Sequence, residues 1–567
     1  MTEPLVPHRA DRITDGTGQP QDLTVDRRWF MSRMAGLWAA AASAGAAGGT
    51  LFAATPGSAA PAPTAAGRSG PGTPKDWWDG AFARTIRPEA LADPTELTIS
   101  EAAAAFRRRL LKPVDLMDAY LDRINRYEAR YQAFLWRRPD AELLDLARRT
   151  KIHSGSTALA GITTAEKDNY YTAGIPTTAM SPVYQGFVPA YDSTVHARLR
   201  TDGAIMIGKA AMGPLASGRA RLPDGTATTY NAWTPDDIRY SPSGSSGGTA
   251  TAVAARLATS GTGTQTGGSI TSPSNAQNLT GLKPTFGRTS LYGIVPLTIT
   301  HDHPGPLARD AMDAAIMLQS VAGPDPNDPR TLGLPEVPNY IRSAEVYYWK
   351  KRIRVRWETT LGYPPDYLTG ANEETRPLRE AMLAAMQTVG VIVREVPYPE
   401  GWSELTGTVT STSGEGTNLF LPVLQQDVRL FADRLTGFLN GQFRSADSYL
   451  KAMEARYLLL KRTLDQFFGQ CDVLLIGTAV DRIGLPMMAF PYGLGVDQTT
   501  GLTVPRGTTI AAPPFGEERL LAVVAAYQAV TDHHLRRPPD PSGPVGAGAR
   551  VAAPYKVPAD YDATEES

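Results

Sequence analysis

Two serine- and glycine-rich segments near the middle of the chain contain the residues best suited to chemistry. Residues 241–248 read Ser-Pro-Ser-Gly-Ser-Ser-Gly-Gly, and residues 261–270 read Gly-Thr-Gly-Thr-Gln-Thr-Gly-Gly-Ser-Ile. A serine hydroxyl becomes a nucleophile when a nearby base accepts its proton. Glycines permit turns whose backbone N–H groups converge on one point, where they can stabilise an oxyanion. An activated nucleophile and oxyanion donors are what the cleavage of an amide requires.

Two simpler interpretations of these segments are a flexible linker and a phosphate-binding loop. Glycine- and serine-rich linkers do not usually flank an alanine-rich helix, which residues 249–257 predict. A phosphate-binding loop is disfavoured because no G-K-[ST] sequence follows either segment.

A further interpretation makes Ser246 the nucleophile of an α/β-hydrolase, since its surroundings, Gly-Ser-Ser-Gly-Gly, fit G-x-S-x-G. That triad needs an aspartate and then a histidine later in the chain. Asp302 is followed directly by His303, which is too cramped for two separate roles. His533 and His534 lie in a segment with the pattern of an amphipathic helix. The match is therefore weak.

Further motifs at compatible spacing give the chain a resemblance to a known family. After the two segments, residues 281–288 read Gly-Leu-Lys-Pro-Thr-Phe-Gly-Arg. Before them, 161–168 read Gly-Ile-x-x-x-x-Lys-Asp and 174–179 read Gly-Ile-Pro-Thr-Thr-Ala. Shorter matches lie at 192–209, 305–309, 322–328 and 513–527. The chain thus resembles the amidase signature family over roughly 97–538, and it resembles that family least over 330–480.

The resemblance implies a Ser–Ser–Lys catalytic arrangement. Carried over residue by residue, Lys167 is the base, Ser245 is the bridging serine and Ser269 is the nucleophile that becomes acylated. The offset between the two serines, 269 − 245 = 24, agrees with the spacing in the family. The family also implies a cis peptide bond between Gly244 and Ser245.

This arrangement is chemically coherent. A lysine with an ordinary pKa of about 10.4 is a poor base near neutral pH, but burial disfavours its charged form and lowers that pKa. Ser245 would then relay a proton from Ser269 to Lys167 and later to the leaving amine. The oxyanion is expected to bind to backbone N–H groups of the glycine turn, those of Thr266, Gly267, Gly268 and Ser269.

Three positions depart from the family pattern. The family usually has Asp where this chain has Gln265, Arg where it has Thr271, and Gly where it has Ser243. One interpretation is that a charged pair was lost together, which leaves no unpaired charge. The other is a catalytically silent binding protein that retains the fold. Because the three catalytic positions remain, we favour an active enzyme.

Composition excludes several other classes of protein. Among 567 residues, 56 Lys and Arg balance 57 Asp and Glu for a net charge of −1, without the basic excess that nucleic-acid binding usually shows. The single cysteine, Cys471, excludes internal disulfides and CxxC metal or redox sites. The seven histidines never form H-E-x-x-H. We expect neither a metal nor an organic cofactor.

Helices and short β-like segments alternate along the chain and must position these residues. The pattern predicts an α/β fold with a mixed β-sheet core covered by helices on both faces. Expected strands lie at 204–208, 352–357, 391–396 and 472–476. Expected helices lie at 97–131, 139–150, 194–201, 249–257, 311–321, 376–389 and 443–468.

The two ends of the chain are expected to lie outside the catalytic domain. Residues 1–60 resemble a twin-arginine export signal, because Arg27 and Arg28 precede a weakly apolar run that is too rich in Ala and Gly for a stable membrane span. A Pro/Ala/Gly-rich linker is expected over 61–90, a single domain over 91–538 and a loose tail over 539–567. The divergent 330–480 region is expected to shape the substrate pocket.

These observations predict an exported amidase, extracellular or in the cell envelope, whose partners are a small-molecule or peptide amide and the twin-arginine export machinery. A carbamate or ester hydrolase using the same triad and a silent secreted binding protein stay open as alternatives. Part of a transamidase that modifies aminoacyl-tRNA is a poor alternative, given the export signal and the neutral charge balance.

Overall fold

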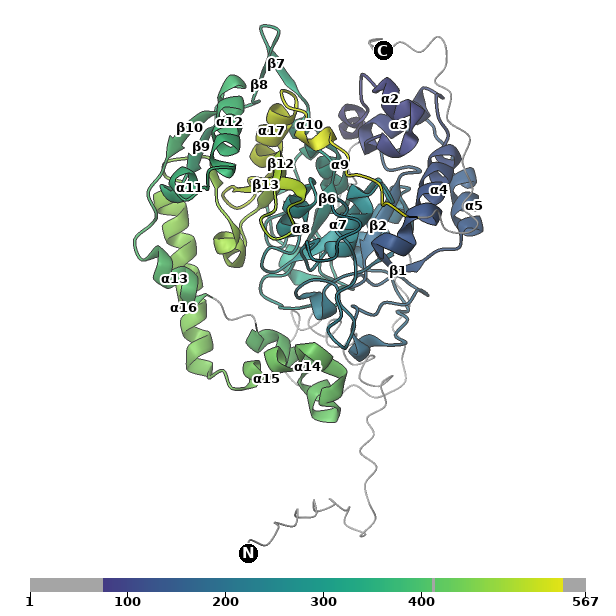
Figure 1. The fold of residues 1–567 in the computed structure, drawn as a ribbon. Helices are drawn as coiled ribbons and strands as arrows, with labels where there is room; N and C mark the ends of the chain where they lie inside the picture. The colour runs from purple at the N-terminus through teal and green to yellow at the C-terminus, as the bar shows by residue number, and fades with distance from the viewer. Residues whose placement is uncertain (1–74, 410–412, 544–567) are drawn as a thin grey trace, which may run out of the picture.

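One large sheet forms the centre of the computed structural model, which describes residues 75–409 and 413–543 (Figure 1). The sheet has eleven strands and is mixed, with helices on both of its faces, which confirms the predicted fold class. The pairs β3–β2, β2–β4, β11–β9 and β9–β10 are parallel, and the others are antiparallel. In spatial order the strands are β1 (Phe134–Arg137), β3 (Ile205–Ala210), β2 (Thr163–Lys167), β4 (Ser260–Gln265), β6 (His303–Ala308), β5 (Thr280–Lys283), β12 (Met487–Val496), β13 (Thr503–Ala511), β11 (Val473–Leu475), β9 (Thr360–Tyr363) and β10 (Ile392–Glu395).

Helices surround this sheet along most of the chain (Figure 1). Helices α2–α5 lie at the end of the molecule that carries β1, and α13 and α16 lie at the opposite end. The α-helices are α2 (Pro88–Ala92), α3 (Ile99–Arg107), α4 (Pro113–Tyr131), α5 (Asp140–Arg149), α6 (Thr194–Thr201), α7 (Gly247–Ala254), α8 (Thr271–Ala276), α9 (Ala311–Val321), α10 (Tyr340–Ala344), α11 (Asp366–Thr369), α12 (Thr375–Thr388), α13 (Trp402–Thr408), α14 (Ser413–Gln426), α15 (Leu435–Gln442), α16 (Ala446–Arg462) and α17 (Glu517–Gln528).

Strand β4 shows how two helices cover opposite faces of the sheet. Ser260 donates a hydrogen bond from Oγ to Met317 of α9, at 3.4 Å. The next residue, Gly261, faces the other way, because a methyl group there would meet Thr249 of α7. The glycines of β4 thus let α7 pack closely on the sheet, so this glycine-rich segment is a core strand and not a linker.

Most expected elements are present, with differences that have physical causes. The predicted helices at 194–201 and 311–321 match α6 and α9. The helical pattern over 97–131 forms two helices, α3 and α4, because Pro113 lacks the N–H needed inside a helix and begins α4 at its first turn. The strand expected at 352–357 is shorter, β8 (Arg352–Arg354), and it pairs with β7 (Tyr347–Trp349) in a separate two-stranded hairpin.

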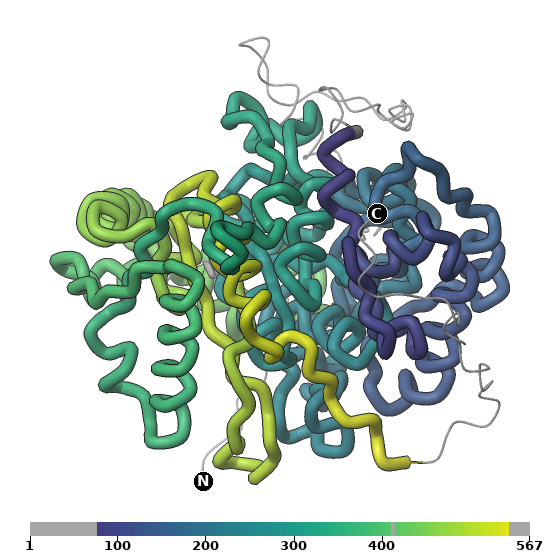
Figure 2. The backbone as a smooth tube through the Cα atoms, turned by 90° about the horizontal axis from the view of Figure 1, so that it is seen from above, coloured from purple at the N-terminus to yellow at the C-terminus, as the bar shows by residue number. Residues whose placement is uncertain are grey.

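The domain boundaries differ from those expected at both ends. The expected export signal lies outside the described residues, but the later part of the expected linker belongs to the fold: Trp78, Ala81 and Ile86 are buried in the hydrophobic core. At the other end, Asp540 forms an ion pair with Arg123 of α4, at 2.5 Å. Figure 2 shows the C-terminal segment running across the surface of the fold.

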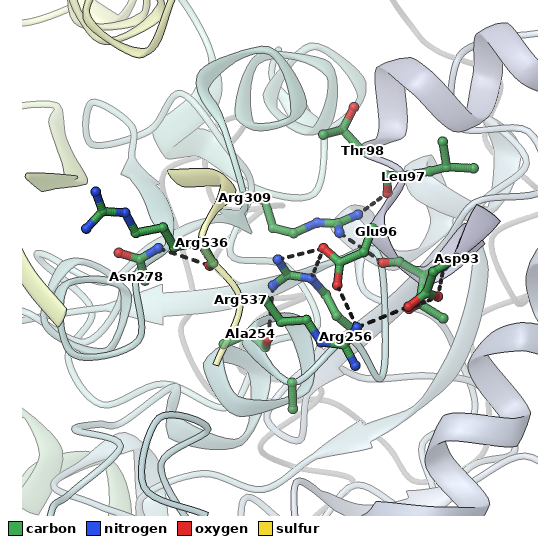
Figure 3. Close-up of polar contacts among 12 residues, drawn as sticks. Asp93, Glu96, Leu97, Thr98, Ala254, Arg256, Asn278, Arg309, Arg536 and Arg537 are labelled. Atoms are coloured by element: carbon green, nitrogen blue, oxygen red, sulfur yellow. Dashed lines mark hydrogen bonds and ion pairs between the residues drawn. The ribbon is translucent and has the colours of Figure 1, made fainter. Parts of the chain in front are cut away.

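A cluster of charged residues joins these two ends (Figure 3). Glu96 pairs with Arg256 at 3.0 Å and with Arg537 at 3.4 Å, and Arg537 also pairs with Asp93 at 3.1 Å. Arg309, next to strand β6, donates to the backbone carbonyls of Thr95 and Leu97. The cluster therefore fixes the first and last described segments to the central sheet.

In the part of the chain that the structure describes, no helix combines the length and the hydropathy needed to cross a membrane.

Candidate active site

Lys167 is the last residue of the central strand β2 and is fully buried. Its Nζ donates to Ser245 Oγ at 2.8 Å, to Thr264 Oγ1 at 2.8 Å and to the Thr264 carbonyl at 3.2 Å. Burial lowers the pKa of Lys167 to about 7, although the carboxylate of Asp302 acts in the opposite direction. A substantial fraction of this amine is therefore neutral near pH 7 and able to accept a proton.

The sequence pattern gave no role to Thr264 and Asn169, which hold this lysine in place. Thr264 lies on β4, the parallel neighbour of β2. Asn169 Nδ2 donates to Thr264 Oγ1 at 3.1 Å and to the Val295 carbonyl at 3.3 Å. The three contacts match the three N–H donors of the ammonium. After loss of one proton, the two remaining N–H groups can still face the Thr264 oxygens while the lone pair faces Ser245.

Ser245 lies two residues before helix α7, and the peptide bond that joins it to Gly244 is cis, as the resemblance implied. Its carbonyl accepts a hydrogen bond from the N–H of Gly213 at 2.9 Å. Gly244 is required here, because a side chain would overlap the backbone carbonyl of Gly218. This packing holds the Ser245 hydroxyl against Lys167.

Ser269 lies on the turn between β4 and α8 and lines a cavity of about 450 Å³. It is 7% exposed, against 1% for Ser245, so it is the more accessible of the two serines. The N–H of Ser246 donates to the Ser269 carbonyl at 3.3 Å. Among the described residues, no hydrogen bond joins the two hydroxyl groups of Ser245 and Ser269. The cavity is lined by Ala216, Ser217, Gly218, Arg219, Ser241, Ser243, Gly244, Thr266, Gly267, Ser269, Leu297 and Arg482.

Of the turn residues expected to bind an oxyanion, some line the cavity and one does not. Thr266 and Gly267 line the cavity together with Ser269. Gly268 does not line it, and its N–H instead interacts with the Asp481 carboxylate. Burial raises the pKa of Asp481, and this N–H acts against the rise. Gly268 has a φ of +89°, which favours glycine and makes the turn possible. The geometry therefore favours Thr266 and Gly267 over Gly268 as donors.

Gln265 fills the position where the family usually has Asp. Its Oε1 accepts the N–H groups of Ile270 and Thr271, each at 2.8 Å, and its Nε2 donates to Asp481 Oδ1 at 2.5 Å. The neutral amide thus binds the start of α8 by two hydrogen bonds and anchors it to Asp481 by a third. Asp481 also pairs with Lys283, at 3.4 Å, so its charge is balanced.

Asp302 is a second buried carboxylate whose role the sequence left open. It accepts hydrogen bonds from Thr266 Oγ1 at 2.5 Å and from the N–H groups of Leu297 and Thr298 at 2.7 and 2.9 Å. It therefore fixes the turn that carries Ser269. Only the fold could reveal this role, because Asp302 is far from the turn in sequence.

The interpretation of Ser246 as a nucleophile finds no support. Ser246 is fully buried, and its Oγ donates to the Thr264 carbonyl at 3.4 Å. His303 contacts the Gln265 carbonyl, and burial lowers its pKa well below the ordinary value. His533 lies in a short 3₁₀ turn after α17, not in the helix expected there.

Comparison with known proteins identifies the family. The family model described as Amidase matches residues 115–493. The chain belongs to the amidase family. Its members act on the C–N bond of amides, and this chain is accordingly an amide hydrolase.

Individual relatives of this amidase cover most of its length. A glutamyl-tRNA(Gln) amidotransferase protein of Geotalea daltonii is 31% identical over 491 residues, covering 78% of this chain and 99% of that protein. The solved structure of the native peptide amidase from Stenotrophomonas maltophilia has a TM-score of 0.64 at 26% identity, covering 78% of this chain and 98% of that one. An amidase family protein from Bacillus anthracis shares the fold, with a TM-score of 0.66 at 23% identity, covering 80% of this chain and 95% of that one.

The divergent 330–480 region approaches the site of this amidase from one side. A smaller cavity of about 220 Å³ shares Gly267 and Arg482 with the main one. Thr406 and Val409, which belong to that region, contribute to its wall.

Proposed function

We propose that this amidase is exported and hydrolyses a carboxamide through an acyl-enzyme on Ser269, with Ser245 as proton relay and Lys167 as base. The main support is the 2.8 Å contact between Lys167 Nζ and Ser245 Oγ in a fully buried site where the lysine pKa falls to about 7. A buried neutral amine next to a hydroxyl is the arrangement that general-base activation requires.

In the first step the Ser269 oxygen bonds to the amide carbon. Its proton passes to Ser245, whose own proton passes to Lys167, so that one ammonium forms for each tetrahedral adduct. When the C–N bond breaks, the proton returns through Ser245 to the leaving nitrogen, and Lys167 is neutral again. Water then attacks the acyl-enzyme by the same relay, releasing a carboxylic acid and regenerating Ser269.

The negative oxygen of the adduct would be stabilised by backbone N–H groups of the turn. Thr266 and Gly267 are the strongest candidates because they line the cavity with the nucleophile. Removal of one such donor in an enzyme typically costs about 3 kcal/mol of transition-state stabilisation. Asp302, which accepts a hydrogen bond from the Thr266 side chain, would keep the turn in place.

The proposed substrate is a small or peptide amide. The solved neighbour from Stenotrophomonas maltophilia is a peptide amidase, whereas the Geotalea relative is named for glutamyl-tRNA(Gln). A net charge of −1 offers no basic excess for tRNA, and the proposed export signal, 1–60, would separate the enzyme from it. Replacing Arg27 and Arg28 by Lys should retain the protein inside the cell, whereas unchanged export would contradict the proposal.

Labelling with a fluorophosphonate and mapping the adduct by mass spectrometry tests the mechanism. We expect the adduct on Ser269, lost in Lys167→Ala and in Ser245→Ala. Lys461→Ala is the control, because the Lys461 side chain is 71% exposed on α16 and pairs with Asp465, away from the serines of the site. An adduct on Ser246 would contradict the assignment.

Failure of folded protein to react with the label would favour the alternative of a silent binding protein. The observation behind that alternative is the neutral pair at Gln265 and Thr271, although the three hydrogen bonds of Gln265 replace the contacts that a charge would make. A panel of amides, carbamates and esters then distinguishes an amidase from a carbamate or ester hydrolase that uses the same triad.

A further inference from the structure

The main cavity contains positive charge that the proposed reaction does not use. Two of its lining side chains are arginines, Arg219 and Arg482, and no Asp or Glu is among the described residues that line it. The two arginines come from segments far apart in the sequence, and both share the cavity with Ser269. Both are partly buried, so water screens their charge less than it would on an open surface.

Most of the hydrogen-bond donors of these arginines have no acceptor within the described residues. Both terminal nitrogens of Arg219 donate to a single atom, the Ile238 carbonyl, at 3.2 and 3.3 Å, and its buried Nε has no partner there. Arg482 donates to the Val409 carbonyl at 3.4 Å. A guanidinium carries five N–H donors in a fixed fork, so both side chains retain capacity for a ligand.

The carboxylates close to the cavity are engaged by other groups. Asp302 accepts hydrogen bonds from Thr266 and Leu297, which line the cavity. Asp433 pairs with Arg221 at 2.9 Å. Asp481, next to Arg482 in the chain, is directed toward Lys283 and Gln265.

A third cation also reaches the cavity wall. Arg434 donates to Ser217 Oγ at 2.7 Å, and Ser217 lines the cavity. Among the described residues that line the cavity, the charged side chains are thus all cationic.

We propose that the substrate is an amide that also carries a carboxylate, which Arg219 and Arg482 bind while the scissile carbonyl lies at Ser269. This inference rests on the proposed function, since it names the class of amide that the site selects. Guanidinium groups match the two oxygens of a carboxylate in geometry and charge. Burial lowers the pKa of both guanidinium groups; Asp481 partly offsets this for Arg482, whereas Arg221 adds to it for Arg219. A bound carboxylate would offset it for both arginines, and a neutral amide would not.

Two matched pairs of chromogenic or ultraviolet-detectable substrates test the proposal. Succinic mono-4-nitroanilide and butyric 4-nitroanilide differ only by a carboxylate in place of a methyl group on the acyl side. 4-Butyramidobenzoate and butyranilide place the difference on the amine side. We expect kcat/KM to favour the acid in at least one pair by about tenfold or more, and the preference to fall as NaCl is added. The proposal would be overturned if kcat/KM were no higher for the acid than for the neutral compound in both pairs.

Variants of the two arginines test whether these residues cause the preference for the acidic substrate. Arg219→Gln and Arg482→Gln should each bring the acid-to-neutral ratio of kcat/KM toward one, and Arg482→Lys should keep part of it because the charge remains. The control is Arg149→Gln, whose side chain is 77% exposed, on α5. Ratios that stay unchanged in both glutamine variants would contradict the assignment of these residues.

A binding measurement separates this proposal from the catalytic one. Calorimetric titration of Ser269→Ala with both pairs of compounds needs no turnover, and we expect the acid of at least one pair to bind at least about tenfold more tightly than its neutral counterpart. Absence of turnover in the native enzyme together with this binding preference would refute the mechanism and support the anionic ligand. Turnover without any preference, or equal binding of acid and neutral compound in both pairs, would refute the anionic ligand alone.

Discussion

At the scale of single residues, the chemistry depends on the protonation of one buried amine. The Lys167 ammonium loses hydration in its site, and its pKa falls to about 7, whereas an exposed lysine stays protonated until about pH 10.4. The neutral amine can accept a proton from Ser245, and the ammonium cannot. Activity should therefore depend on pH in the range where this group titrates.

We predict that kcat/KM rises by about tenfold per pH unit below 7 and levels off above that pH, because the active form of Lys167 is the deprotonated one. The measurement is kcat/KM for one nitroanilide between pH 5 and 9. Lys167→Arg should be inactive throughout, since a guanidinium keeps its proton over this range. A flat profile between pH 5.5 and 8.5 would exclude Lys167 as the base.

The departures from the family pattern also belong to this scale. Gln265 makes contacts to two backbone N–H groups and to Asp481, so the turn is held without a charge at position 265. The charges nearby belong instead to Asp481 and Lys283, which lie far apart in sequence and meet only in the fold.

At the scale of helices and strands, the close packing of α7 on the sheet determines the position of Ser245. A methyl group added at Gly248 would lie 2.6 Å from the Ala211 nitrogen and 2.7 Å from the Ala133 carbonyl oxygen. These are backbone atoms of the layer below, so they cannot rotate away. Any side chain at Gly248 must therefore displace the beginning of α7.

We predict that Gly248→Ala destabilises the fold by about 1–3 kcal/mol and abolishes most of the activity, because Ser245 moves away from Lys167. Thermal unfolding and kcat/KM measure the two effects. The matched control is Gly407→Ala in α13, where a methyl group would meet nothing within 4 Å; it should be neutral or slightly stabilising because alanine favours helix. Full activity in Gly248→Ala would show that α7 can shift without consequence.

The sequence predicted elements well where the pattern was local and poorly where partners are distant. The helices at 194–201 and 311–321 show regular apolar spacing and match α6 and α9. Strand β12 escaped prediction because Pro491, Gly493 and Gly495 are residues that strands disfavour. Pairing on both sides of β12 overrides that preference, with a register shift between Pro491 and Gly493.

The residues of the candidate site divide in the same way. Those in local motifs could be predicted from the sequence, and those whose partners are distant could not. Lys167, Ser245 and Ser269 stand in contiguous motifs, so their positions could be read from the sequence. Thr264 also stands in such a motif, but its contact with the lysine required the fold. Asp302 carries no local signal at all, and its role became visible only with its hydrogen bonds.

At the scale of the whole molecule, the charged cluster around Glu96 connects both ends of the described chain. Burial would raise the pKa of Glu96, but the charges of Arg256, Arg309 and Arg537 outweigh it, so the pKa lies below its ordinary value. A carboxyl with a depressed folded-state pKa stabilises the fold above its unfolded pKa. That contribution is lost as the pH falls through the lower folded value.

We predict that Glu96→Gln lowers the free energy of unfolding by about 3 kcal/mol at pH 7, because it leaves the buried guanidinium of Arg256 without its carboxylate partner. The difference from the native protein should shrink as the pH falls below about 4.3, the ordinary pKa of Glu. Denaturant unfolding at pH 7 and at pH 3.5 measures both effects. Glu89→Gln on the exposed face of α2 is the control, and an equal loss in both variants would contradict the role of the cluster.

The central pairing of the sheet sets an order of folding during synthesis. Strand β5 pairs with β12 through Lys283 and Met487, which are 487 − 283 = 204 residues apart. At a translation rate of about 5–20 residues per second, β5 waits on the order of 10–40 s for its second neighbour to leave the ribosome. During that interval its edge can pair with other nascent chains. Its length of four residues, and Pro284 directly after it, limit the template that this edge offers.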